Sequence, residues 1–190
     1  MINHELKCIF IHPPRTAGTS IEVSLDHRDW WHHGLRSEKH IVASEAKELY
    51  KGYWDTYLKF ATIRNPYERA VSLYSWEVKK GSKRSFEDFL NNQDKDSMWG
   101  KTLKAYLDEP LDYILRHETI SNNFNHLCHL LQIAPVRLRR SATSTRQQHW
   151  NHYYTDVWMV DSVSNYYAED FQQFNYKIWS PLKNKPISLL

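Results

Sequence analysis

The sequence predicts an α/β protein with a P-loop-like, three-layer fold, in which helices cover both faces of a central, mostly parallel sheet. Three strand-like runs, at residues 7–12, 57–63 and 111–118, are each followed by a stretch with helical spacing. Strands that alternate with helices favour a parallel sheet covered on both faces. Two of the strands end abruptly at polar loops that carry an arginine, "PPRTAGTS" and "RNP". Because no repeat, low-complexity tract or linker interrupts the pattern, residues 1–190 are predicted to form a single domain.

The helices of this fold can be located by their spacing and their caps. Helical spacing is expected at residues 19–27, 43–54, 66–78, 121–131 and 156–174. Pro66 suits the first turn of a helix, with Asn65 as its cap. Ser85 and Asp88 have the spacing of a capping box, which predicts a further helix beginning at "SFEDFL".

Composition narrows the class of protein. The net charge of +3, from 25 Lys and Arg against 22 Asp and Glu, is too small to indicate a nucleic-acid-binding protein, but it suits one local anion site.

No apolar stretch approaches the roughly 20 residues that a membrane helix needs. The first strand begins by about Lys7, so we expect no signal peptide and a cytoplasmic location. Cys8 and Cys128 lie in apolar runs and are expected to be buried free thiols.

The loop after the first strand has the features of a phosphate-binding site. A strand that breaks into a loop and then a helix directs several backbone N–H groups, and the positive end of the helix dipole, at one point. The hydroxyls of Thr16, Thr19 and Ser20 add donors, and Arg15 adds a positive charge. Gly18 allows a tight turn. The alternative is an ordinary strand-to-helix turn with a hydroxyl cap.

The loop after the second strand repeats this arrangement. Arg64 lies where the strand ends, and Ser72 follows eight residues later in the expected helix. Ligands of open α/β sheets bind at the carboxyl ends of the strands. Arg64 and Ser72 are therefore candidates for a second anion site near the first. Taken alone, this segment strongly favours the alternative, in which Arg64 forms a local cap or a salt bridge, for example with Glu68, and Ser72 is an ordinary helix residue.

Together, "IFIHPPRTAGTS" and "FATIRNPYERAVSLY" resemble the two nucleotide-binding signatures of the sulfotransferases, most of all the carbohydrate branch with heparan-2-O-like and bacterial enzymes. The segments "EKHIVASEAKELY", "HETISNNFNHLCHLLQI" and "YYTDVWMVDSVSNYYAEDFQQFNY" are similar to further parts of that family, so the resemblance extends from about residue 7 to 176. One departure is Arg15, which stands where the branch usually has Lys. The two cations are not interchangeable, because Arg binds as a planar fork and Lys as a point charge.

The resemblance implies an enzyme that uses 3′-phosphoadenosine 5′-phosphosulfate (PAPS) as sulfate donor and needs no metal. Five residues, with Arg15, would hold the 5′-phosphate: Thr16, Ala17, Gly18, Thr19 and Ser20. Arg64 and Ser72 would hold the 3′-phosphate, and Arg140 and Ser141 are further candidates for contacts with the nucleotide.

Catalysis is expected to use Arg15 for the charge that grows on the leaving phosphate and His40 as general base, since histidine suits proton transfer near neutral pH. His32, His33 and Glu45 are the alternatives to His40. The histidine and cysteine spacings match no zinc pattern.

The acceptor is expected to be a hydroxyl of a saccharide. Five side chains are candidates to line its cleft: Trp30, Trp31, His32, His33 and Arg36. The basic stretch "SWEVKKGSKR" is a candidate to attract an anionic polysaccharide. A second copy of the chain that completes the cleft, in a homo-oligomer, is left open. Two other functions remain in competition: a P-loop nucleotide or sugar kinase, which the missing G-K-[ST] disfavours, and a protein that only binds nucleotides or anionic glycans.

Overall fold

The computed structural model describes residues 1–26, 39–94, 96–97, 100–139 and 148–180. The chain divides into two compact units. The first comprises Met1–Asn65 and Asp94–Ser144, and the second comprises Pro66–Gln93 and Thr145–Leu190. That residues 1–190 act as one domain stays a prediction.

The first unit is built on a four-stranded sheet with the order β1-β2-β3-β4. Its strands are β1 (Ile2–Asn3), β2 (Cys8–Ile11), β3 (Leu58–Ile63) and β4 (Tyr113–Arg116). β2, β3 and β4 are mutually parallel, and only β1 is antiparallel to its neighbour. The predicted mostly parallel sheet is therefore confirmed. The edge strand β1 is not predicted by the sequence, because two residues are too few to show a hydrophobic period.

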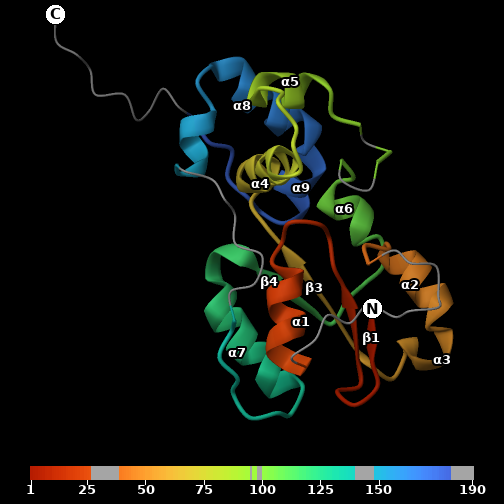
Figure 1. Cartoon of the computed structure of the whole chain (residues 1–190). Coiled ribbons are helices and arrows are strands. Elements are labelled where there is room, and N and C mark those ends of the chain that lie inside the picture. The colour runs from red at the N-terminus through yellow and green to blue at the C-terminus, as the bar shows by residue number, and fades with distance from the viewer. Residues whose placement is uncertain (27–38, 95, 98–99, 140–147, 181–190) are drawn as a thin grey trace, which may run out of the picture. The chain divides into compact units, whose positions relative to one another are not determined.

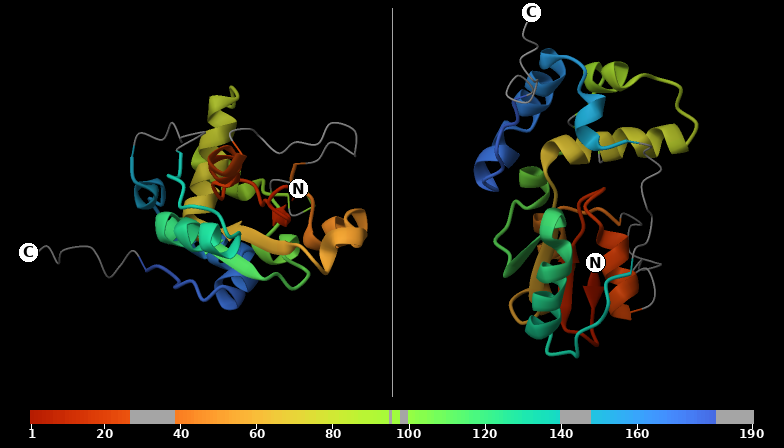
Figure 2. Two further views of the ribbon diagram at one scale, coloured as in Figure 1. Left: turned by 90° about the horizontal axis from the view of Figure 1, so that it is seen from below. Right: turned by 90° about the vertical axis from the view of Figure 1, so that its left-hand side faces the viewer.

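Helices cover both faces of this sheet. α1 (Gly18–Asp26) and α7 (Ile120–Leu130) lie on one side, and α2 (Ala43–Leu49) and α3 (Lys51–Trp54) lie on the other (Figures 1 and 2). Cys8 and Phe10 pack in a fully buried cluster with residues of α1 and α7. Ile9 and Ile11 are equally buried and, because successive strand side chains alternate, they point to the opposite face.

Most elements begin and end close to the predicted positions, and the differences are local. The helix expected over 43–54 is divided at Tyr50 into α2 and α3, and that expected over 156–174 is divided at Tyr167 into α8 and α9. The strand expected over 111–118 ends at Arg116, where the short 3₁₀ helix η1 (His117–Thr119) begins. The first unit also contains the short helix α6 (Leu103–Tyr106).

The second unit is helical and has an aromatic core. Its described residues form α4 (Pro66–Lys79), α5 (Phe86–Asn91), the 3₁₀ helix η2 (Trp150–Tyr153), α8 (Val157–Tyr166) and α9 (Ala168–Gln173). The Tyr67 ring stacks on Trp150 and packs against Tyr154 and Phe171. The capping box predicted at the start of α5 is confirmed, since the Ser85 side chain accepts from the Asp88 amide and the Asp88 carboxylate accepts from the Ser85 amide.

Candidate active site

Three loops meet the same edge of the sheet, because β2, β3 and β4 run parallel. β2 ends at Ile11 and is followed by the segment 12–17, which leads into α1. β3 ends at Ile63 and is followed by Arg64 and Asn65, and β4 leads into η1. The backbone N–H of Asn65 donates to the carboxylate of Glu118 in η1. This edge is where open α/β folds bind their ligands.

The first loop adopts a strained backbone that suits an anion. Arg15 and Ala17 have φ angles of 67° and 78°, in the left-handed region that side-chain-bearing residues rarely enter. Each such residue costs roughly 1–2 kcal/mol. Left-handed residues within a turn direct neighbouring N–H groups to one point, the geometry of anion-binding loops. The loop then passes directly into α1, where the N–H groups of Ser20 and Ile21 donate to the Ala17 carbonyl.

Gly18 is required at the start of α1 by a close contact. A Cβ atom at this position would lie 1.9 Å from both Cδ2 and Nε2 of His12. The His12 ring is 4% exposed and stacks on Phe10, so it has little room to withdraw. The sequence suggested a tight turn as the reason for this glycine. In the structure the reason is steric, because only glycine leaves room for the imidazole of His12.

Thr16 fastens the loop to the sheet. Its buried hydroxyl donates to the Pro13 carbonyl at 2.7 Å and lies 2.6 Å from the hydroxyl of Thr62 in β3. Because the Thr16 proton is used on Pro13, Thr62 is the donor in the second contact. The Thr16 hydroxyl therefore holds the loop in place. If Thr16 donates a hydrogen bond to a ligand, the donor is its backbone N–H.

The two predicted arginines lie together. The Arg64 guanidinium donates from Nη1 to the backbone carbonyl of Arg15 at 3.2 Å, and Arg64 is only 6% exposed. Burial, and after it the positive charge of Arg64, lowers the pKa of the Arg15 guanidinium. An anion in contact with a guanidinium favours its charged form.

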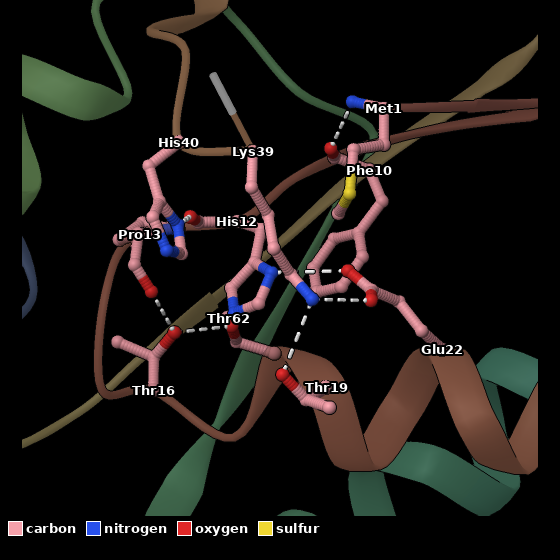
Figure 3. A network of polar contacts seen from close by, with 10 residues as sticks. All are labelled: Met1, Phe10, His12, Pro13, Thr16, Thr19, Glu22, Lys39, His40 and Thr62. Carbon is pink, nitrogen blue, oxygen red and sulfur yellow. Dashed lines mark hydrogen bonds and ion pairs between the residues drawn. The ribbon is translucent and has the colours of Figure 1, made fainter. Parts of the chain in front are cut away.

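His40 also lies at this edge, beside His12 (Figure 3). Its Nδ1 is 2.6 Å from the His12 carbonyl oxygen, and the two rings meet edge to face at 4.7 Å. A carbonyl oxygen only accepts, so Nδ1 of His40 carries the proton, and in the neutral ring Nε2 is the basic nitrogen. His40 therefore has the tautomer that a general base needs. Glu45, an alternative base, is exposed in the first turn of α2.

Beneath the loop lies a buried polar network that the sequence did not reveal (Figure 3). The fully buried carboxylate of Glu22 contacts Nδ1 of His12 at 3.0 Å and Nζ of Lys39 at 2.9 Å. The Lys39 ammonium also donates to the Thr19 hydroxyl at 3.3 Å. The feature of the sequence that could have indicated this network is Glu22, an acidic residue directly after the buried Ile21 in a helix with few other charges.

For the other predicted residues, a place at this edge stays a prediction. Ser72 is buried in α4, which belongs to the second unit, so its pairing with Arg64 stays a prediction. Arg140 and Ser141, and the acceptor candidates Trp30, Trp31, His32, His33 and Arg36, lie outside the described residues. Just before Arg140, the backbone N–H of Arg139 donates to the Ser24 hydroxyl of α1 at 2.7 Å.

Within the described part of the chain, no group of three or more His, Cys, Asp or Glu side chains is placed to hold a metal ion. None of its helices combines the length and apolar character needed to cross a membrane. Cys8 and Cys128 are free and buried, as predicted.

Comparison with known proteins identifies one family for this chain. Residues 24–177 match the model of a family described as the sulfotransferase family. The match covers more than half of the chain and includes His40, Arg64 and Ser72, whereas the first loop precedes it. Searches of curated proteins and of solved structures gave no match. A family match of this extent, on a chain with the α/β fold described above, shows that the protein belongs to the sulfotransferase family.

Proposed function

We propose that the protein transfers a sulfuryl group from PAPS to a hydroxyl group of a carbohydrate. The observation that carries the proposal is the pairing of Arg15 and Arg64, two cations from consecutive parallel strands at one end of the sheet. A donor with phosphates at both the 5′ and 3′ positions offers two anionic groups to such a pair. The nucleotide ATP lacks the 3′-phosphate.

The nucleotide would bind with its 5′ end in the first loop. Arg15 and the backbone N–H groups of residues 16–20 would contact the 5′-phosphate, where the left-handed turn and the start of α1 both favour negative charge. Arg64 and Ser72 would hold the 3′-phosphate. Arg140 and Ser141 complete the proposed nucleotide contacts.

The chemical step is an in-line displacement at sulfur. The acceptor oxygen forms a bond to sulfur while the bond between sulfur and the 5′-phosphate oxygen breaks, and adenosine 3′,5′-bisphosphate (PAP) leaves. The acceptor proton passes to Nε2 of His40, whose Nδ1–H is held by the His12 carbonyl. Arg15 stabilises the negative charge that develops on the leaving phosphate.

The acceptor is proposed to be a saccharide on the basis of the carbohydrate branch that the sequence resembles. The proposal includes no metal, and it leaves open a partner copy that completes the acceptor cleft. A screen of mono- and oligosaccharides with radiolabelled PAPS identifies the acceptor directly. Transfer of label to at least one saccharide is expected; transfer only to phenols or alcohols that are not sugars would exclude the carbohydrate part of the proposal.

Calorimetry separates this function from its two competitors. We expect PAP to bind clearly more tightly than ADP or ATP, because only PAP carries both phosphates that the arginine pair can contact. Equal or tighter binding of ATP would favour a kinase. Tight PAP binding without transfer of label to any hydroxyl compound would favour a protein that only binds nucleotides.

A further inference from the structure

Glu22 is an unexpected residue to find beneath an anion-binding loop. Its side chain is 0% exposed, and it lies one helical turn after Gly18 in α1. Burying a carboxylate is costly unless cations and hydrogen-bond donors compensate it, and an apolar residue of similar size would avoid that cost. Its negative charge also opposes an anion bound at the start of the same helix. Anion affinity therefore does not account for a carboxylate here.

The contacts of Glu22 lead to both neighbours of the proposed base. One carboxylate oxygen holds the His12 ring, and the other holds Lys39, which precedes His40 in the chain. His12 in turn touches His40 twice, through its carbonyl oxygen on Nδ1 and through its ring edge. The orientation of His40 is thus determined from two sides by groups that Glu22 binds.

We propose that Glu22 is a positioning residue for sulfuryl transfer, holding His12 and Lys39 so that His40 keeps the place and the Nδ1–H tautomer required of the base. This inference rests on the proposed function of His40. Glu22 touches neither donor nor acceptor and acts only through His12 and Lys39. Its carboxylate is retained for the rate of the reaction, at some expense of donor affinity.

Glu22→Gln tests this role, because glutamine preserves the size of the side chain and can accept from His12 but loses the charge that holds Lys39. We expect kcat for PAPS with the acceptor found in the screen to fall about 10- to 100-fold, the scale of a catalytic group displaced by about 1 Å. PAP affinity by calorimetry is expected to be unchanged, or tighter by up to about fivefold, since a nearby negative charge is removed. The matched control is Glu48→Gln on the exposed face of α2, which should change neither quantity.

A purely structural role gives a different pattern. Parallel losses of PAP affinity, turnover and melting temperature would overturn the proposal, as would turnover equal to that of the unaltered protein. His12→Asn provides a second test, because the asparagine amide lies where Nδ1 of histidine lies and can still donate to Glu22. Turnover should fall less in His12→Asn than in His12→Leu, and the reverse order would contradict the network described here.

Nitrogen-15 spectra of the histidine side chains separate this inference from the proposed function. The unaltered protein should show His40 protonated at Nδ1, and Glu22→Gln should shift or broaden that signal. If no sulfuryl transfer is found, the proposed function fails, but the spectra still report on positioning. Identical His40 signals in the two proteins would overturn the role of Glu22 whatever the activity.

Discussion

Burial lowers the pKa of the Arg15 guanidinium, and the neighbouring positive charge of Arg64 lowers it further. Both effects disfavour the charged form of Arg15, and an anion in contact with the two guanidiniums would offset them. Arg64 contributes more than charge, because its Nη1 bond to the Arg15 carbonyl also holds the strained turn. At the scale of single residues, the proposed nucleotide site depends most on Arg15 and Arg64.

Replacing Arg64 measures that contribution. Arg64→Ala should weaken PAP binding by roughly 1.5–3 kcal/mol in calorimetry, the scale of a charge-assisted hydrogen bond. Arg64→Lys should lose less, because the charge remains while the planar fork is lost. Lys51→Ala, which removes an exposed cation from α3, is the control and should bind PAP normally. Unchanged affinity in Arg64→Ala would remove this residue from the site.

Replacing His40 tests the base independently of the nucleotide. His40→Ala should lower turnover by about 10²- to 10⁴-fold, the usual contribution of a general base, while PAP affinity stays nearly the same. Rapid-quench or steady-state transfer of radiolabelled sulfate provides the measurement. Retained turnover would assign the proton transfer to another group.

The residues of this edge differ in how far the sequence predicts them. Arg15 and Arg64 could be found because each follows a strand, and parallel strands bring their carboxyl ends together. The roles of His12, Glu22 and Lys39 could not be found in this way. In their network Glu22, inside α1, contacts His12 at the end of β2 and Lys39, which lies 17 residues after Glu22 in the chain. No local spacing in the sequence indicates contacts of this kind.

At the scale of elements, the packing of the loop that connects β2 to α1 depends on Gly18. Gly18→Ala should displace the His12 ring and destabilise the protein by about 1–3 kcal/mol, as overpacking of a filled core does. Chemical denaturation measures the change. In Gly52→Ala the new methyl group meets no atom within 4 Å, so this helical control should be neutral or stabilising. Combining Gly18→Ala with His12→Ala should restore part of the loss; an additive loss would show that the clash lies elsewhere.

The central position of β2 also makes stability sensitive to alkaline pH. Burial raises the pKa of the Cys8 thiol from 9.0 to about 12. The folded state therefore keeps this proton when the unfolded state loses it, so the stabilisation is complete below pH 9 and declines as the pH rises toward 12. The decline is at most about 1.4 kcal/mol per pH unit.

Denaturation of the unaltered protein and of Cys8→Ala at pH 8 and at pH 10 isolates this effect. Cys8→Ala should lose less stability between the two pH values than the unaltered protein does. Equal losses would assign the alkaline sensitivity to other groups, among them the buried Tyr154 and Tyr167, whose pKa values are also raised by burial.

Elements with a local signal were predicted and those without one were not. β2 and β3 follow from apolar runs, and α5 follows from the Ser85 capping box. The breaks at Tyr50 and Tyr167 were missed because neither glycine nor proline marks them, so the helical spacing on the two sides reads as continuous.

At the scale of the whole molecule, the second unit uses some of the aromatic residues, which make up 14% of the chain, as a packed core. The sequence alone could not distinguish rings that form a core from rings that bind sugars. The structure places Tyr67, Trp150, Tyr154 and Phe171 in the packed centre of the second unit.

Ser72 also belongs to the second unit, so Ser72→Ala tests whether the helical unit contributes to binding of the 3′-phosphate. A loss of PAP affinity is expected, with little change in affinity for adenosine 5′-phosphate.

The central claim is that the loops after β2 and β3 bind one doubly phosphorylated nucleotide. A crystal structure of the protein with PAP tests it most directly. We predict a single PAP molecule whose 5′-phosphate contacts Arg15 and the start of α1 and whose 3′-phosphate contacts Arg64. A structure in which PAP binds away from both arginines, or in which only one of them contacts it, would contradict the account.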